Sequence, residues 1–372
     1  MFKTIKNAWS IPDLRKKILF TLLVIIVFRF GSVIPVPFLD AEALRALMDS
    51  VMGNNNGSYL DMLSGGAFSN ATLFAMGVSP YINSSIIMQL LTVAIRPLER
   101  MAKEGEEGRK KIATITRYVT VILGLIQGTA YYFYLRNSSV DGQNIVLYRD
   151  GGAGVFVAFI IILTFTAGTA LMMWMGEQIN QKGIGNGISI LLFAGIVARL
   201  PSTFNMLAEF FNLAIQSPST SGQYFVFVPL FVVLFLAVIW VIVFMQDSER
   251  RIPVQYAKRV VGRKMYGGQS SHIPIKIAMS GVMPIIFASC ILSIPSTIEM
   301  FMGGNVTGFW EGFFNAFSPN GWLYSVLYFL LIIMFSYFYL TIQYNPVEMA
   351  NNLRQNNGTI PGIRPGKPTS EF

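Results

Sequence analysis

A heavily basic stretch lies over Gln246–His272, QDSERRIPVQYAKRVVGRKMYGGQSSH. Arginine and lysine at this density can bind anionic lipid, an acidic protein surface or RNA phosphates. The residues around Gly262 predict a protruding β-hairpin that carries these cations, because they are β-branched or aromatic: Val254, Tyr256, Val260 and Val261. The alternative is that the charge only fixes the orientation of the chain in a membrane, for which a few residues would be enough.

A second group consists of polar, mostly uncharged residues inside the apolar run Leu73–Ile95, namely Ser79, Pro80, Tyr81, Asn83, Ser84, Ser85 and Gln89. Polar residues at this density normally face other helices, where they form hydrogen bonds, rather than lipid. Ile82 and Ile86 lie one helical turn apart, and Ile188 and Leu192 repeat that spacing after the glycine-rich turn KGIGNGIS. Aliphatic pairs at this spacing are usually packing or lipid contacts, so the spacing alone assigns them no function.

The segment Tyr59–Asn70, YLDMLSGGAFSN, is apolar enough to enter a membrane but is broken by Gly65 and Gly66. It predicts a half-helix or re-entrant segment, whose irregular backbone is tolerated at membrane depth only where protein packs around it or it lines a cavity. A surface loop leading into the next apolar run is the alternative. Composition alone does not choose between the two.

The sequence lacks the residue patterns of an enzyme, because it contains no phosphate-binding loop, catalytic dyad or metal-ligand cluster. The single cysteine, Cys290, lies inside an apolar run, and the single histidine, His272, lies at the boundary of one. We therefore expect no catalytic residue, no cofactor and no metal. The energy for any transport must then come from a partner.

The composition shows which elements must position these groups. Hydrophobic residues make up 53% of the 372 residues and charged residues 13%, which is far from the norm for soluble proteins. A bilayer core about 30 Å thick needs roughly 20 apolar residues per helix. The sequence contains eight such runs, at Ile18–Pro35, Leu73–Ile95, Thr116–Leu135, Val155–Trp174, Ile184–Leu200, Tyr224–Phe244, Ile273–Ile298 and Trp322–Leu340. We therefore predict an all-α membrane protein, a polytopic helical bundle.

Arginine and lysine are concentrated before the first run, between the second and third, and between the sixth and seventh. Cytoplasmic loops retain these residues, so both termini are expected in the cytoplasm, and the net charge of +9 is first a sign of topology. The first run is too long for a cleavable signal peptide and is expected to stay in the membrane. Two other classes remain open: a small-solute transporter, which usually needs intramembrane ionisable groups, and a scaffold or insertase without a pore.

Several long motifs follow one another along the whole chain: VFRFGSVIPVP, MLSGGAFSNATLFAMGVSPYINSSIIMQLL, AKEGEEGRKKI, GEQINQKGIGNGISILLFAGIVA, RRIPVQYAKR and GTIPGIRPGKPT. Through these motifs the chain resembles the SecY/Sec61-alpha family of channel subunits of the Sec protein translocon. The resemblance implies a protein-conducting channel that passes unfolded polypeptides across the membrane and releases transmembrane segments sideways into lipid. It also implies that SecA or the translating ribosome supplies the energy.

The resemblance implies three sites within the membrane. A plug at about 59–70 would close the external half of the pore, with Leu60, Met62, Leu63, Gly65, Gly66 and Phe68. A constriction ring, which would gate by dewetting, would consist of Ile82, Ile86, Ile188, Leu192 and Ile286. Spans two, three, seven and eight would form a lateral gate, with Asn83, Gln89, Gln127 and Ala278. Many relatives carry an asparagine at the position of Ala278, so this closed gate is expected to be more apolar.

The resemblance also implies a docking surface for the ribosome or the motor ATPase SecA, formed by Arg250, Arg251, Lys258, Arg259, Arg263, Lys264 and Arg364. Further expected partners are SecE, SecG, secretory and membrane-protein substrates, membrane lipids and ribosomal RNA. The expected location is the bacterial cell (inner) membrane.

Family members have ten spans in two inverted five-span halves. The corresponding division here is a first half at 1–216, with spans one to five and the plug, and an incomplete second half at 217–372. The second half holds spans six to eight and the basic loop 246–272. Spans nine and ten are not present in this sequence, so a shortened form of a longer protein is expected, unstable or inactive by itself.

Overall fold

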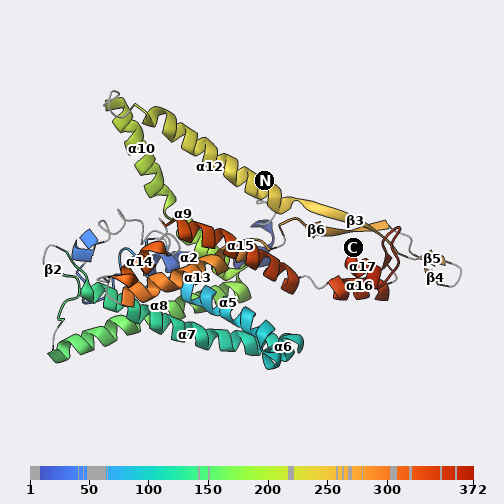
Figure 1. Cartoon of the computed structure of the whole chain (residues 1–372), viewed down its shortest axis with the longest axis horizontal. Helices are drawn as coiled ribbons and strands as arrows, with labels where there is room; N and C mark the ends of the chain where they lie inside the picture. Colours follow the sequence, from blue (N-terminus) through green and yellow to red (C-terminus); the bar gives the residue numbers. More distant parts are fainter. Residues whose placement is uncertain are drawn as a thin grey trace. The chain divides into compact units, whose positions relative to one another are not determined.

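The computed structural model of the chain in Figure 1 describes residues 9–40, 42–44, 46–47, 64, 66–140, 143–149, 151–216, 222–256, 259–261, 264–266, 270–278, 280–301, 308–317, 321–343, 346–356 and 358–372. Contacts divide the chain into two units. The first comprises Met1–Asn205 and Cys290–Ser325, and the second comprises Met206–Ser289 and Val326–Phe372. Three helices contribute residues to both units: α10 (Leu200–Gln216), α13 (Met283–Phe301) and α15 (Trp322–Gln343).

The first unit is built mainly of helices. They are α2 (Pro12–Gly31), α5 (Ser79–Ala94), α6 (Arg96–Lys103), α7 (Glu106–Asn137), α8 (Gly151–Lys182), α9 (Gly187–Val197) and α14 (Phe309–Ala316), with the short strands β1 (Ser139–Val140) and β2 (Gln143–Asn144). The helix α7 packs along α8 and against α5. A side-chain carbon at Gly124 would lie 3.1 Å from Thr169 Cγ2, and one at Gly128 would lie 3.3 Å from Phe165 Cβ. These glycines therefore allow the close helix approach that is typical of membrane bundles.

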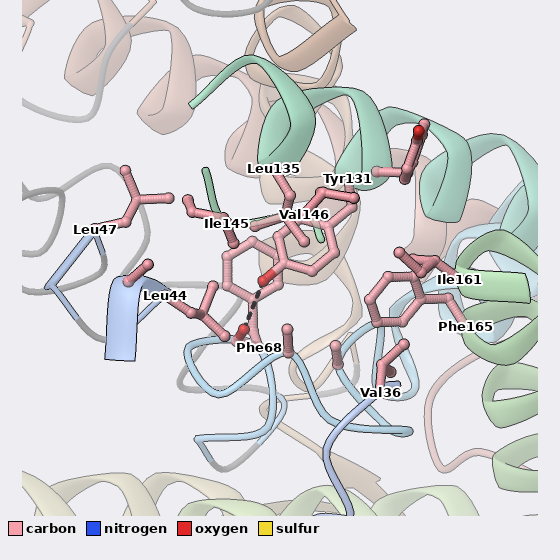
Figure 2. Packing of buried hydrophobic residues seen from close by; sticks show 14 of the residues in the cluster. Val36, Leu44, Leu47, Phe68, Tyr131, Leu135, Ile145, Val146, Ile161 and Phe165 are labelled. Carbon is pink, nitrogen blue, oxygen red and sulfur yellow. Dashed lines mark hydrogen bonds between the residues drawn. The ribbon is translucent and has the colours of Figure 1, made fainter. Parts of the chain in front are cut away.

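One hydrophobic core of the first unit lies between α7 and α8. Figure 2 shows how Tyr131 and Leu135 of α7 meet Ile161 and Phe165 of α8 around Phe68. The buried Tyr131 hydroxyl donates a hydrogen bond to the Phe68 carbonyl oxygen at 2.8 Å. Tyr131 is thus held both by the packing of its ring and by the hydrogen bond of its hydroxyl group.

The second unit combines apolar helices with a small sheet. It contains α12 (Tyr224–Asp247), β3 (Glu249–Tyr256), β4 (Arg259–Val261), β5 (Lys264–Tyr266), β6 (Ser270–Lys276), α16 (Pro346–Gln355), β7 (Gly358–Thr359) and α17 (Lys367–Glu371). Strands β3 and β6 pair antiparallel from Glu249↔Lys276 to Gln255↔Ser270, and β4 pairs antiparallel with β5. The predicted β-hairpin is therefore confirmed.

Five helical stretches in the described part of the chain are long and apolar enough to cross a membrane: Glu106–Asn137, Gly151–Lys182, Gly187–Gln216, Tyr224–Asp247 and Trp322–Thr341. The other three predicted spans correspond to α2, α5 and α13, which have 20, 16 and 19 residues. Each of the eight apolar runs therefore contains a helix, and the predicted fold class of an all-α membrane bundle agrees with the structure.

The predicted start of the seventh span at Ile273 is wrong. Ser270–Lys276 forms strand β6, and α13 begins at Met283. Along β6 the exposed residues His272, Pro274 and Lys276 alternate with half-buried Ile273 and Ile275. This period of two is the pattern of a strand with one covered face, and cross-strand pairing with β3 outweighs the apolar composition.

Candidate functional site

The predicted ring residues of α5 and α9 share one environment. Ile82, Ile188 and Leu192 are half-buried and pack against the same cluster. Its buried members are Val24, Phe28, Ala67, Phe74, Val78, Met172, Met175, Ile179 and Leu191. Ile86, one turn after Ile82, is only 6% exposed. The structure thus brings three of the five predicted ring residues onto one apolar cluster, which includes Ala67 of the predicted plug segment.

Two asparagines fix the start of α9 and with it the position of Ile188. The Asn180 side-chain oxygen accepts a hydrogen bond from the Gly187 backbone N–H at 2.7 Å. The Asn186 side-chain oxygen accepts from the N–H groups of Ile188 and Ser189 at 3.1 and 3.4 Å. Asn186 is therefore a helix N-cap, which satisfies donors that the first turn leaves unpaired.

The turn before α9 packs so closely on α8 that only glycine fits. A side-chain carbon at Gly187 would overlap the Gly176 carbonyl oxygen and would lie 2.8 Å from Ile179 Cβ. Gly176 in turn leaves room for Ile188 Cδ1. The glycine-rich turn KGIGNGIS therefore places the aliphatic pair of α9 against α8.

We expect Gly187→Ala to lower the free energy of unfolding by about 1–3 kcal/mol, the usual range for overpacking a tight contact. Backbone atoms of α8 receive the added methyl group, so no side chain can move aside. Thermal unfolding of the purified protein in detergent measures the change. Gly152→Ala in α8 is the matched control, because nothing lies within 4 Å of a side-chain carbon there. Equal stability of both variants would contradict the tight fit.

Ile286, the fifth predicted ring residue, lies in the second unit on the first turn of α13, and its side chain is half-buried. Its neighbour Phe287 is 1% exposed and packs edge-on against Phe335 of α15, with ring centroids 5.4 Å apart. The Ser280 and Ser336 hydroxyls lie 3.3 Å apart, within hydrogen-bond distance. Within this unit, the start of α13 is therefore held against α15.

The predicted gate residues occupy different surroundings. Asn83 accepts a hydrogen bond from the Cys290 thiol, with 3.0 Å between Sγ and Oδ1. Gln127 is half-buried in α7, Gln89 is exposed near the end of α5, and Ala278 is half-buried between β6 and α13. Among the residues that the structure describes, no hydrogen bond joins Asn83 to Gln127. Sequence reasoning missed Cys290 as a partner of Asn83, although a lone thiol inside an apolar run was the available signal.

Spans three and four are joined at one end by an ion pair that sequence reasoning also missed. Arg117 Nε of α7 lies 2.6 Å from Glu177 Oε1 of α8. The two side chains are 44% and 20% exposed, so the pair lies at a boundary of the bundle rather than in its interior.

In α6, the hydrogen bond from Lys103 lowers the pKa of the Glu99 carboxyl.

The described part of the predicted plug is irregular and buried. Gly66 has a φ of 90°, and residues 66–70 are turns. Phe68 is 5% exposed, and its N–H donates to the Ser64 hydroxyl at 3.0 Å. Gly65 and Gly66 in the sequence indicated an irregular backbone covered by protein, and residues 66–68 agree with that prediction. A surface loop does not fit Ala67 and Phe68, because both side chains are buried. The predicted plug residues Leu60, Met62, Leu63 and Gly65 lie outside the described residues.

The predicted docking cations lie on the sheet and on the segment after α16. Arg250 and Arg251 on β3 are exposed, as is Arg364. Arg251 Nε lies 3.7 Å from Glu249 Oε2, and the Arg250 guanidinium lies 6.0 Å from the Phe372 ring centroid. The backbones of Arg259 and Lys264 belong to β4 and β5. Lys258 and Arg263 lie outside the described residues. Among the residues that the structure describes, no group of His, Cys, Asp and Glu could hold a metal ion.

Comparisons with known proteins identify relatives of this chain. A sequence model of the SecY family matches residues 72–372. The protein translocase subunit SecY of Streptomyces galbus is 41% identical over 380 residues, which cover 100% of this chain and 84% of the relative.

Two solved structures share the fold. One, described as the structure of a protein conducting channel, has a TM-score of 0.63 and 17% identity, and the match covers 99% of this chain and 84% of that one. The other, Sec61 in a canine ribosome-channel complex, has a TM-score of 0.51 and 17% identity, over 83% of this chain and 66% of that one.

The small-solute transporter and the scaffold without a pore are therefore not the class of this protein. The expectation of a channel subunit that is not an enzyme agrees with the family of these relatives. On its sequence identity to a curated relative over the whole chain, this protein belongs to the SecY family of protein translocase subunits.

Proposed function

We propose that this translocase subunit conducts unfolded polypeptides past an aliphatic constriction formed by Ile82, Ile86, Ile188, Leu192 and Ile286. The observation that carries the proposal is the packing of Ile82, Ile188 and Leu192 on one apolar cluster. Aliphatic side chains at a constriction exclude water and ions while the pore is empty. They offer no fixed hydrogen bonds to a passing chain, so they can adapt to any sequence.

The proposed plug is the segment at 59–70, which would close the external half of the pore. Ala67 supports this assignment, because it is fully buried in the cluster that also receives Ile82, Ile188 and Leu192. The hydrogen bond between Tyr131 and the Phe68 carbonyl would hold the segment in the closed state.

The proposed lateral gate uses Asn83, Gln89, Gln127 and the region of Ala278. On its α7 side, α5 is fixed by the buried Ser84 hydroxyl, which donates to the Thr116 carbonyl oxygen at 2.7 Å. The bond between Cys290 and Asn83 supports a polar contact between α5 and α13 that could separate on opening. Apolar signal sequences and transmembrane segments would leave between these helices.

The proposed docking surface comprises Arg250, Arg251, Lys258, Arg259, Arg263, Lys264 and Arg364 and faces the cytoplasm. The partners that we propose are the ribosome, SecA, SecE and SecG. A solved protein of the same fold is described in a ribosome-channel complex, which supports the ribosome as partner. Ribosomal RNA phosphates and anionic membrane lipids would match the sign of the surface. Under this orientation, both termini of the chain lie in the cytoplasm of a bacterial cell (inner) membrane.

The division into inverted halves at 1–216 and 217–372 is also a proposal. The two contact units follow different boundaries, because α10, α13 and α15 each contribute to both units. Halves related by inverted symmetry are defined by the order of their spans rather than by contacts. The spans of the first half lie within α2 to α9, and the spans of the second half lie within α12 to α15.

We expect membranes depleted of their own SecY to recover export of a hydrophilic secretory protein when this subunit is supplied with its partner subunits and, as a separate polypeptide, with spans nine and ten of a family member. The measurement is protection of the exported protein from external protease in membrane vesicles, with SecA and ATP. A precursor without a signal sequence is the control. Insertion of membrane proteins without export of the hydrophilic protein would contradict a conducting channel and would indicate an insertase.

A further inference from the structure

The basic hairpin is joined to a segment that lies far away in the sequence, Pro346–Phe372, called here the distal segment. Its strand β7 pairs antiparallel with β3, with Gln255 opposite Thr359 and Tyr256 opposite Gly358. The sheet order is β6-β3-β7, so β3 is the central strand. The Thr359 hydroxyl adds a hydrogen bond to the Gln255 carbonyl oxygen at 3.3 Å.

Buried apolar residues lie on both the hairpin and the distal segment. Val254 of β3 is fully buried, and Ile360, directly after β7, is 9% exposed. Ala350 of α16 is 4% exposed, and α16 contacts both β7 and α17. The Arg250 guanidinium lies 6.0 Å from the centroid of the Phe372 ring at the other end of the segment. Strand pairing and a cation–π contact therefore both join the two segments.

The hairpin needs the distal segment for its stability. A two-stranded hairpin is at best marginally stable in water, and a third strand or a packed helix is needed for independent stability. The β3–β6 hairpin receives its third strand, β7, from the distal segment, and α16 contacts that strand. Exposed cations lie on both parts, with Arg250 and Arg251 on the hairpin and Arg354 and Arg364 on the distal segment.

We propose that the distal segment is a positioning element, which holds the hairpin and itself as one cytoplasmic module, so that a docking partner binds cations of both together. The proposal rests on the docking function proposed above. It assigns a role to Gly358, Thr359 and Ile360, which carry no charge and would not contact the partner. Binding of the docking partner is then lost when the hairpin and the distal segment separate, although every cation of both is kept.

The test is binding of purified ribosomes to the translocase complex in proteoliposomes, measured by co-sedimentation. Gly358→Pro together with Thr359→Pro removes both backbone N–H groups of β7. We expect affinity to fall about tenfold or more, because cations on separated segments no longer bind one surface together. Thr359→Val is the matched control, since it removes only the hydroxyl bond, and affinity should stay within about twofold. Trypsin should cut the hairpin of the double-proline variant faster.

A disulfide provides a rescue that a general folding defect would not show. Ile360→Asp should weaken the module by placing a carboxylate at a buried position. Adding Gln255→Cys and Thr359→Cys, with Cys290→Ser to leave no other thiol, joins the opposed residues covalently when oxidised. We expect ribosome binding to return in the oxidised form and to be lost on reduction.

The outcomes separate this inference from the docking function. If the double-proline variant binds ribosomes as well as the unchanged protein, while Arg250→Glu with Arg251→Glu does not bind, the distal segment does not position the hairpin and docking stands. Failure of the formed disulfide to restore binding would also overturn the inference. If charge reversal leaves ribosome binding unchanged, docking itself is wrong.

Discussion

Replacing Ile82, Ile86 and Ile286 by serine in the assembled translocase complex is expected to raise the ion conductance of the resting channel by about an order of magnitude or more, because a constriction lined with hydroxyl groups holds water. Ile86 is only 6% exposed, and Ile82 packs half-buried on the apolar cluster around Val78 and Leu191. Hydroxyl groups at these positions would hydrate the closed path. Conductance in planar bilayers measures the effect.

The same substitutions should relax the requirement for a good signal sequence, because a wetted ring costs less to open. Export of a precursor with a defective signal sequence would rise. Ile87→Ser is the matched control, since Ile87 lies next to Ile86 on α5 but is 37% exposed. Unchanged conductance together with unchanged signal selectivity would contradict the ring assignment.

Reversing Arg250, Arg251, Arg259 and Arg263 to glutamate is expected to weaken binding of SecA or ribosomes strongly while membrane insertion of the chain persists. Each lost phosphate contact weakens a polyanion complex and lowers the salt dependence of its affinity, so four reversals should cost about a hundredfold or more. The remaining affinity should respond less to ionic strength than that of the unchanged protein. Co-sedimentation at several salt concentrations measures both quantities.

Lysine at the same four positions is the control, because it keeps the charge and the membrane orientation. Binding that survives the change to lysine but not the change to glutamate would show that charge carries the contact. Binding of both SecA and ribosomes by the glutamate variant would instead favour the simpler interpretation, in which the cations only fix topology.

The helices could be predicted from the sequence because length and hydropathy set membrane spans almost independently of their neighbours. Trp322–Leu340, for example, agrees closely with α15, which spans Trp322–Gln343. The predicted start of the seventh span at Ile273 was wrong because the structure of this segment does depend on a distant neighbour. Strand β6 depends on pairing with β3, and that partner lies about twenty residues earlier in the sequence. Composition alone cannot show such pairing.

The candidate site was predicted only in part, for a related reason. Helical spacing indicated that Ile82 and Ile86 share a face, and that Ile188 and Leu192 do, but only the resemblance joined the two pairs. Bonds between distant residues left no periodic signal in the sequence. The Cys290 thiol meets Asn83 at 3.0 Å, and Arg117 meets Glu177 at 2.6 Å. Such contacts depend on the packing of whole helices, so single-sequence reasoning could not find them.

The helix α12 has no buried residue along its 24 positions. At its start, the rings of Tyr224 and Phe225 contact Phe210 and Phe211 of α10. Along the rest of its length, its place in a bilayer is secured mainly by partitioning into hydrocarbon. Evolution would then act on the sum of its transfer free energies and not on the shape of any one residue. Leucine, isoleucine, valine and phenylalanine become interchangeable there, whereas the tightly packed glycines of α7 admit no such drift.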